Sequence, residues 1–261
     1  MFKTLNLHLK DYTPTPPSLA DPTSSTGVRP SVDVELAKLF HHYYLDTRGV
    51  APPPYDPAHF EHLSLLTPDA AFRVQGDGFG SGPESRKRCS NELGQALCRW
   101  LLQEHLGITH FAHMAHVLNG NSQRAFDGYT VEKIAAGDGP DYLCTDGADV
   151  FLAEAKGRIR AINFGNADFE SWRGQFDRVA VRTSDGVARA VKGHIVATRF
   201  ATEANSAQVQ SAIYAEDPAS PGDGPLREPK PLINAVKALH YVDIARKLRQ
   251  PHLSRALLSG V

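Results

Sequence analysis

The chain has 261 residues, which is long enough for one sizeable core or for a core domain with an appendage. Its hydrophobic content of 41% and charged content of 22% are those of an ordinary globular protein, and no apolar run approaches the length that crosses a bilayer. The formal net charge of −1 excludes a global field that attracts nucleic acid, so only a locally basic groove could do so.

The cysteines and the N-terminus indicate the cellular compartment. Cys89, Cys98 and Cys144 are odd in number and widely spaced, so they form neither a disulfide framework nor a Cys-x-x-Cys zinc pattern. Residues 1–6 lack the long apolar core and the small-residue cleavage site of a secretory signal. These features predict a cytoplasmic protein with reduced thiols and no membrane contact.

Residues 1–85 are expected to form a Pro-rich arm and a helical appendage. Five prolines among residues 1–30 predict an extended or partly disordered arm. Ser31 is suited to cap a helix over about residues 32–45. The Gly-rich residues 76–83 lack the Gly-Lys-Ser/Thr ending of a phosphate loop, so they predict a flexible connection to the core.

The core is expected over residues 86–216 and begins with a helix. Apolar residues at helical spacing predict this helix over roughly residues 91–105. Residues 109–118 alternate and predict a strand whose three histidines fall on both faces, which favours packing over a three-His metal site. The polar residues 119–138 predict an excursion with a short helix near Val131.

Residues 139–157 carry more chemical information than any other stretch. Two short apolar runs, residues 142–144 and 150–153, flank Asp146-Gly147, which is a strong turn signal for a hairpin. A hairpin folded there lays its two strands side by side, so residues that enter the first strand meet residues that leave the second.

Two carboxylates and one ammonium are gathered at one end of this hairpin. Asp141 enters the first strand, and Glu154 and Lys156 leave the second on one face because they are two residues apart. Asp141 and Glu154 suit a hard cation such as Mg²⁺, which takes one or two protein carboxylates and keeps several waters. Such a metal activates a bound water and polarises a phosphoryl oxygen, while Lys156 orients the water or offsets charge on the phosphate.

The remaining elements are a helix, two strands and a tail. A helix is expected over about residues 169–181, and residues 193–200 and 211–214 predict strands. Residues 217–261 then form a linker and a C-terminal helical tail. That tail packs on the core, contacts a partner or grips DNA, and the sequence leaves these alternatives open. It is locally basic through Arg246, Lys247, Arg249 and Arg255.

Pro140-Asp141, followed after the hairpin by Glu154-Ala155-Lys156, resembles the PD-(D/E)xK motif of restriction-endonuclease-like nucleases. The resemblance covers about residues 90–200, and the expected order of helix, strand, two-stranded hairpin, helix and strand agrees with the αβββαβ core of that fold. The fold class that we expect is therefore α/β, with a mixed sheet flanked by helices and with helical appendages at both ends.

A second Glu-x-Lys triplet serves as an internal control. Glu228-Pro229-Lys230 has the same spacing, but it lies among Pro and Gly residues where no interior strand can form. Only the triplet at Glu154 ends an apolar run and has Pro-Asp upstream across a turn. The alternative interpretation of that stretch is a surface hairpin with ordinary charged ends.

The resemblance implies a role for each residue of the motif. Asp141, Glu154 and the backbone carbonyl of Ala155 would bind Mg²⁺ or Mn²⁺, and Lys156 would position the attacking water. Many such nucleases also place a Glu near the metal on the helix that precedes the sheet, and Glu92 matches that position. Its alternative role is to complement the dipole of its own helix.

Gln175 matches a further position of related nucleases, which often carry a Gln on the helix after the motif and a Tyr four residues later. Here the later position is Val179, so only half of this sub-motif is present. Gln175 is expected to reach toward the carboxylates.

The function that we expect is a Mg²⁺-dependent deoxyribonuclease, with RNA as an alternative substrate. Such nucleases are common in restriction, phage defence and DNA repair, and double-strand cutting would usually require the two active sites of a homodimer. The alternative is a catalytically inactive nuclease-fold subunit that binds nucleic acid or partner proteins through its terminal appendages. The near-neutral charge and the unmatched ends of the chain motivate that second hypothesis, but the presence of all the metal ligands and the lysine favours the enzyme.

Overall fold

The computed structural model describes residues 1–47 and 60–260. The chain divides into two compact units, and two long strands, β8 (Val150–Arg158) and β11 (Lys192–Arg199), each have residues in both. The first unit consists of Met1–His105, Ala155–Phe164 and Val196–Glu216, and the second consists of Leu106–Glu154, Gly165–Ile195 and Asp217–Val261.

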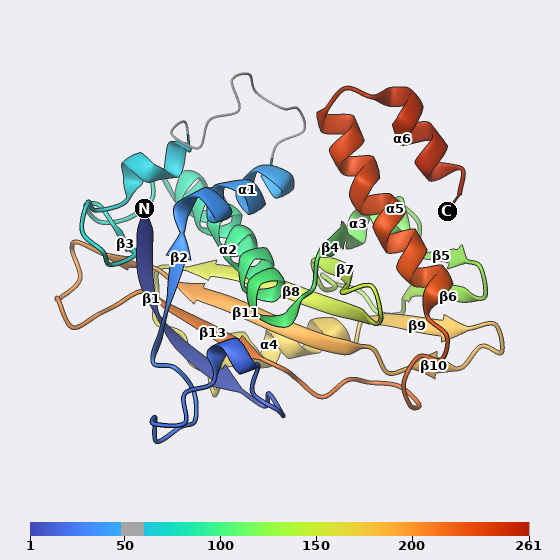
Figure 1. Cartoon of the computed structure of the whole chain (residues 1–261), viewed down its shortest axis with the longest axis horizontal. Coiled ribbons are helices and arrows are strands. Elements are labelled where there is room, and N and C mark those ends of the chain that lie inside the picture. The colour runs from blue at the N-terminus through green and yellow to red at the C-terminus, as the bar shows by residue number, and fades with distance from the viewer. Residues whose placement is uncertain (48–59, 261) are drawn as a thin grey trace. The chain divides into compact units, whose positions relative to one another are not determined.

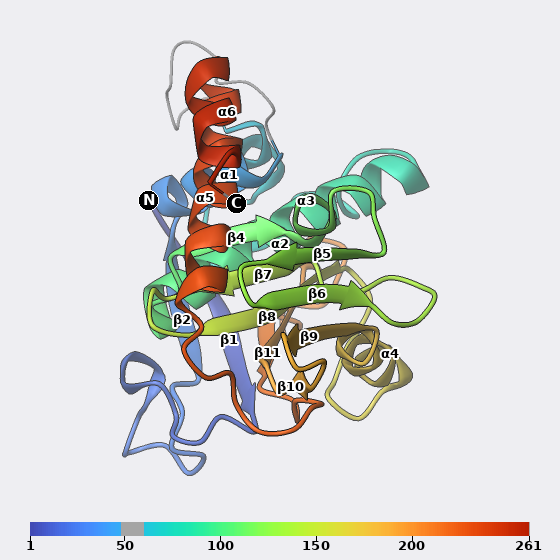
Figure 2. The same cartoon turned by 90° about the vertical axis from the view of Figure 1, so that its right-hand side faces the viewer.

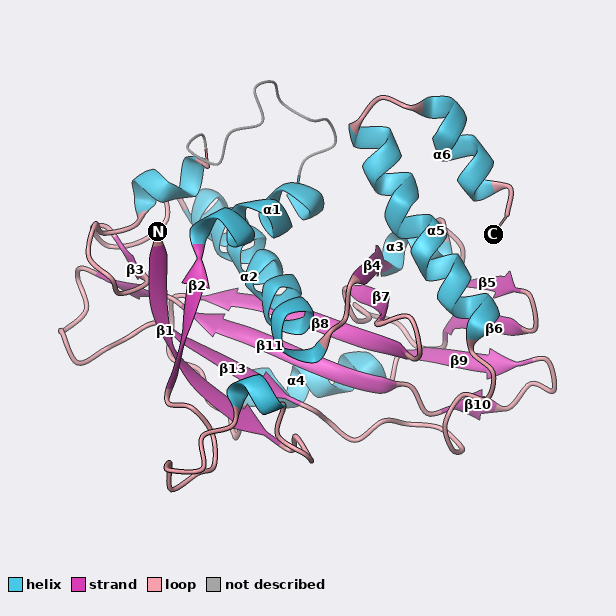
Figure 3. Ribbon diagram, viewed as in Figure 1, coloured by secondary structure: helices cyan, strands magenta, loops and turns pink. Residues whose placement is uncertain are grey.

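The largest sheet is mixed and has the strand order β2-β1-β13-β11-β8-β7-β4 (Figure 3). Strand β1 pairs parallel with β13 and antiparallel with β2, and β7 pairs antiparallel with β4 and β8. The sheet is flanked by helices, so the chain is α/β, as predicted. The bounds of these further strands are β1 Phe2–Lys10, β2 Ser31–Glu35, β4 His110–His113, β7 Tyr142–Thr145 and β13 Ala212–Glu216.

The first unit adds two helices to its strands (Figure 1). These are α1 (Leu36–Thr47) and α2 (Pro83–Leu106). Only the last residue of α2, Leu106, belongs to the second unit. Short elements complete it: the 3₁₀ turns Pro17–Leu19 and Glu61–Leu65, and the parallel pair β3 (Arg73–Val74) and β12 (Ala201–Thr202).

Helix α2 lies directly against the backbone of β8 within the first unit. A Cβ atom on Gly94 would lie 2.6 Å from the nitrogen of Gly157, and one on Gly157 would lie 1.8 Å from the carbonyl oxygen of Ser90. Only glycine lets two backbones approach this closely. The contact therefore fixes the strand segment that carries Lys156 against the helix that carries Glu92.

The second unit contains a smaller antiparallel sheet of order β10-β9-β6-β5 (Figure 2). Its strands are β5 Gln123–Phe126, β6 Tyr129–Lys133, β9 Val179–Thr183 and β10 Ala188–Arg189. Its helices are α3 Met114–Leu118, α4 Ala167–Phe176, α5 Lys230–Lys247 and α6 Pro251–Leu258. Among the residues that the structure describes, no helix is both long and apolar enough to cross a membrane.

The central strands are buried on both faces. All four residues of β7 are buried, as are residues 193–198 of β11 and most of β8. Strands in this position read as continuous apolar runs because helices or loops cover both faces of the sheet. This explains why residues 142–144, 150–153 and 193–200 stood out in the sequence, and all three are strands as predicted.

The N-terminal region differs from its prediction. Residues 2–10, expected as part of an extended or partly disordered arm, form strand β1 between β2 and β13. The helix expected over residues 32–45 begins only at Leu36, because Val32 and Val34 alternate into the core as part of β2. Pairing with a strand about 200 residues away decides this structure, and local sequence does not reveal it.

Three further predictions in the core need correction. The helix over 169–181 ends at Phe176, because Val179–Thr183 pairs with β6 as strand β9. The short helix expected near Val131 is strand β6 itself. The strand expected over 109–118 stops at His113 and continues as α3. In the first two cases, β-branched residues find a strand partner that overrides local propensity.

Candidate functional site

The predicted hairpin is formed by β7 and β8. Their register runs from Tyr142 opposite Ala153 to Thr145 opposite Val150, and the turn between them spans residues 146–149. The Asp146 side chain accepts hydrogen bonds at 2.8 Å from the backbone nitrogens of Ala148 and Asp149. Gly147 has φ +99°, a conformation that favours glycine. The turn chemistry at Asp146-Gly147 therefore sets the register of the hairpin.

This register brings three of the predicted site residues together in the second unit. The Asp141 backbone N–H donates to Glu154 Oε2 at 3.1 Å. With its amide oriented so that the nitrogen faces the carboxylate, Gln175 on α4 also donates to Glu154 Oε2, at 2.8 Å. Asp141 is itself held in place because its carbonyl oxygen accepts from the backbone nitrogen of Met114 at 2.8 Å.

Glu154 has no solvent exposure. Burying a carboxylate is costly unless hydrogen bonds compensate it, and charge-assisted bonds from N–H groups are the strong kind. The donors from Asp141 and Gln175 fix the orientation of the carboxylate. Partners of this kind commonly orient the ligands of a metal.

A polar cavity of about 330 Å³ lies beside Asp141. It is formed where β4 passes into α3, where β6 ends and where β9 begins. Its volume falls in the range of pockets that hold small ligands. Four of its lining residues are ionisable: His113, Lys133, Asp138 and Asp141.

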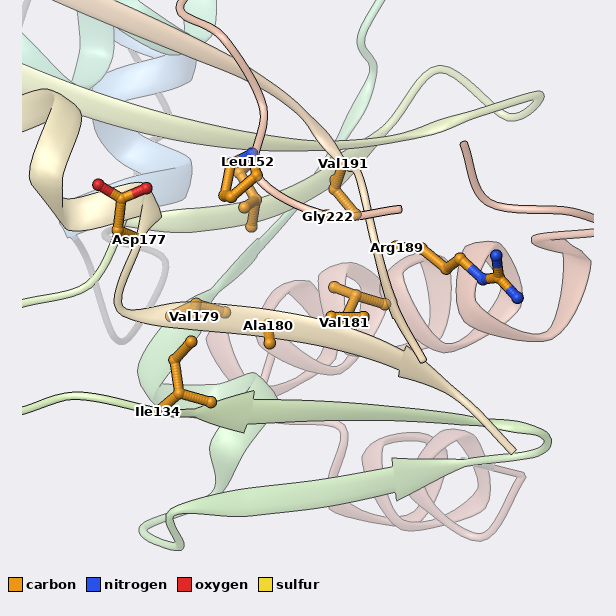
Figure 4. A pocket seen from close by; sticks show the side chains of 11 residues that line it. Ile134, Leu152, Asp177, Val179, Ala180, Val181, Arg189, Val191 and Gly222 are labelled. Atoms are coloured by element: carbon orange, nitrogen blue, oxygen red, sulfur yellow. The ribbon is translucent and has the colours of Figure 1, made fainter. Parts of the chain in front are cut away.

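A second cavity in this unit, of about 120 Å³, has mostly apolar walls (Figure 4). Leu152, Val179, Val181 and Val191 line it, and Val179 also lines the polar cavity. Arg189 at its margin is engaged by Asp185 at 3.3 Å and by the Asp223 carbonyl oxygen at 3.1 Å. The polar cavity, with several ionisable groups, is therefore the stronger candidate for chemistry.

The other predicted site residues belong to the first unit. Ala155 and Lys156 directly follow Glu154 on β8, and Lys156 is partly exposed. Because Glu154 and Lys156 are two residues apart on one strand, their side chains leave the same face.

Glu92 on α2 makes contacts that sequence reasoning missed. Its side chain is 20% exposed, and its Oε2 atom lies 3.4 Å from the hydroxyl group of Tyr43, which donates to it, and 3.3 Å from Nε2 of buried His62. Arg88 lies one helical turn before it, 4.0 Å away. Tyr43 and His62 are 49 and 30 residues from Glu92, so no local pattern connects them.

The residues that could hold a metal ion are few. Within residues 1–47 and 60–260, no group of three or more His, Cys, Asp and Glu side chains is arranged to hold a metal ion. Mg²⁺ needs fewer, because it is usually bound by one or two carboxylates and keeps several waters. Asp141, which lines the cavity, and Glu154, which is fully buried and accepts from two donors, are the two carboxylates that could hold such an ion.

The histidines of the β4–α3 segment have packing and hydrogen-bond partners, and the rings of His113 and His116 pack edge-on with centroids 5.6 Å apart. His116 Nδ1 lies 2.9 Å from Asp243 on α5, and this hydrogen bond raises the pKa of His116. The ring of His110 packs edge-on against Tyr241 on α5. Burial lowers the pKa of His194 on β11 to about 3, with a smaller effect from Lys192, so His194 is neutral at neutral pH.

Comparison of the chain with protein-family models, with curated proteins and with solved structures finds no match. The functional argument therefore depends on the residues and their geometry.

Proposed function

We propose that this protein is a metal-dependent phosphodiesterase that hydrolyses DNA. The observation that carries the proposal is that the Asp141 backbone N–H donates to the Glu154 carboxylate across the hairpin, while Asp141 also lines a cavity of about 330 Å³. Gln175 supports it, because its buried amide donates to the Glu154 carboxylate and orients it, as hydrogen-bond partners of metal ligands commonly do.

The order of elements also supports the proposal. Helix α2, strand β4, the β7–β8 hairpin, helix α4 and strand β11 occur in this order, with α3, β5 and β6 inserted after β4 and with β9 and β10 inserted after α4. The four strands are neighbours in the order β4-β7-β8-β11. This resembles the αβββαβ core of restriction-endonuclease-like nucleases, with the acidic residues at the matching end of the hairpin. Fold alone does not fix a function, so the residues at the site must carry the assignment.

The proposed mechanism assigns one task to each residue. Asp141, Glu154 and the carbonyl oxygen of Ala155 would hold Mg²⁺ or Mn²⁺, which when bound supplies an activated water and a polarised phosphoryl oxygen. Lys156 leaves the same strand face as Glu154, so its ammonium group can donate to the attacking water and offset charge on the phosphate.

Plasmid cleavage in Mg²⁺ tests the proposal. We expect Asp141→Asn and Lys156→Ala each to lower the cleavage rate by about 10²- to 10⁴-fold, as the loss of a positioned catalytic group does. Glu228→Gln is the matched control, because Glu228 has the same spacing to a lysine but lies in a loop. Equal rates for wild type and all three variants would refute the assignment.

A second candidate function is that of a catalytically inactive subunit with the same fold, which binds nucleic acid or partner proteins. The complete burial of Glu154 under Gln175 and the Asp141 N–H favours it, because such a carboxylate can serve structure alone. This second function predicts DNA or protein binding that survives Asp141→Asn, together with no cleavage by the wild type and no affinity for Mn²⁺.

A further inference from the structure

The C-terminal helices concentrate positive charge in a chain whose net charge is −1. Between residues 230 and 261 the only acid is Asp243, which is bonded to His116 and lies 3.5 Å from Arg246. The same stretch contains six cations: Lys230, Lys237, Arg246, Lys247, Arg249 and Arg255. Lys247 is buried, so the other five cations make the surface of α5 and α6 basic.

One face of α5 is anchored to the second unit. Leu232, Val236, Leu239 and Val242 are buried. Strand β4 ends the sheet order, and the backbone N–H of Phe111 on that strand donates to Nδ1 of His240 at 3.3 Å. Helix α5 therefore covers the edge strand of the sheet and leaves its other side available for contacts.

A line of residues along α5 carries two cations and an aromatic ring, with Lys237 half-buried beside Gly147 of the β7–β8 turn and Tyr241 edge-on against His110. Lys230, Lys237, Tyr241 and Leu248 are 7, 4 and 7 residues apart, a spacing that places them on one side of a helix. Tyr241 is 48% exposed and Leu248 is 56% exposed. At the rise of an α-helix, this line is about 27 Å long.

Arg249 and Arg255 follow α5 in the chain and add two further cations. Both are exposed, and Arg249 lies in the turn before α6 with φ +53°. Leu253 of α6 is 52% exposed beside them in sequence. Cations interleaved with an exposed ring match the two needs of unpaired nucleic acid, whose phosphates require charge and whose bases stack on aromatic side chains.

We infer that the exposed surface of α5 and α6 binds single-stranded DNA, and this inference rests on the proposed function only for the choice of DNA. Lys230, Arg249 and Arg255 contact phosphates, and the ring of Tyr241 stacks on a base. Base pairs in a duplex are already stacked on each other, so the ring gives preference to single strands. A duplex gains only the phosphate contacts.

Salt dependence of binding tests the phosphate contacts. The probe is a labelled 20-nucleotide single strand, measured by fluorescence anisotropy in EDTA so that no cleavage occurs. A plot of log affinity against log salt concentration has a negative slope, to which each phosphate contact adds about −0.7. The variant Lys230→Gln/Arg249→Gln/Arg255→Gln should therefore have a slope that is shallower by about 2. Between 50 and 200 mM salt, the wild type should then lose about 20-fold more affinity than this variant.

The matched control removes the same charge from cations that are bonded to acids. It is the variant Lys38→Gln/Arg182→Gln/Lys192→Gln, because these residues pair with Glu104, Glu132 and Asp217 respectively. The control should keep the wild-type slope. Equal slopes for the two triple variants would overturn the inference, because net charge alone would then explain the binding.

Tyr241→Ala tests the stacking contact. It should weaken binding of the single strand by about 5- to 150-fold, which corresponds to the stacking of one base on an aromatic ring, and leave duplex binding unchanged. Tighter binding of a duplex of the same sequence by the wild type would overturn the preference for single strands. Anionic phosphatidylserine vesicles are the third probe, and vesicle binding lost in the basic triple variant while DNA binding persists would assign the surface to membranes instead.

The outcome is separable from that of the nuclease proposal. If Asp141→Asn leaves cleavage intact while the single strand still depends on Lys230, Arg249, Arg255 and Tyr241, the proposed active site is wrong and this surface stands. If cleavage depends on Asp141 but the variants on α5 and α6 bind the single strand as tightly as the wild type, only the present inference is refuted.

Discussion

Two Glu-x-Lys triplets with identical spacing lie in opposite structural settings. Glu154 is buried in strand β8 and accepts hydrogen bonds from Asp141 and Gln175. Glu228 is exposed in a loop with φ +53°, and Lys230 begins α5. On a strand, the side chains of residues two apart leave the same face, whereas across a loop and the start of a helix the same spacing gives no common face. The comparison shows that spacing has chemical meaning only within a defined backbone.

The packing beneath the first triplet gives the largest expected effect on stability. Gly157→Ala would put a methyl group 1.8 Å from the Ser90 carbonyl oxygen, so α2 and β8 must separate. We expect a loss of about 3 kcal/mol in the free energy of unfolding, at the upper end of overpacking. Urea denaturation measures this loss.

Gly174→Ala is the control for that prediction, since its added Cβ meets no atom within 4 Å on helix α4. It should raise stability by about 0.5–1 kcal/mol, because alanine loses less entropy in a helix than glycine. Similar losses for the two variants would show that the close approach of α2 and β8 does not constrain the strand.

Gln175→Leu sharpens the comparison at Glu154 itself. Removing the amide takes away a donor that orients the buried carboxylate, so Mn²⁺ affinity should fall by about 10- to 100-fold, as for other outer-shell partners of metal ligands. Isothermal titration with Mn²⁺ measures the change. Gln123→Leu on the exposed face of β5 is the control and should bind like the wild type.

The smallest effect concerns His116 and Asp243, away from both triplets. Their hydrogen bond raises the pKa of His116, so its contribution to stability is present below the unfolded pKa of about 6.5 and is lost as the pH rises through the folded value. Surface pairs of this kind contribute less than about 1 kcal/mol.

The measurement is the urea midpoint of the wild type and of His116→Gln at pH 5.5 and pH 8.5. The two proteins should differ at the lower pH and converge at the higher one. A constant difference at both values would contradict the ion-pair account.

The hairpin could be predicted from the sequence because its signals are local. Asp146-Gly147 encodes the turn, and the two apolar runs encode buried strands, so the register that places Asp141 beside Glu154 follows directly. The strands at 193–200 and 211–214 were equally readable as short apolar runs.

What escaped prediction depends on distant partners. Strand β1 is formed by pairing with β13, and its own residues lie next to a Pro-rich stretch that suggested disorder. Strand β9 was mistaken for the end of a helix because Val179 fits both periods until β6 provides a partner. The approach of Gly94 to Gly157 joins residues 63 positions apart, and no local pattern encodes it.

Calorimetric titration of Mn²⁺ into the wild type, Glu154→Gln and Glu228→Gln tests the central claim most directly. The account predicts equal affinity for the wild type and Glu228→Gln, and at least about tenfold weaker binding for Glu154→Gln, because only Glu154 is a proposed ligand. Equal affinity in all three proteins, or no binding by the wild type, would contradict it.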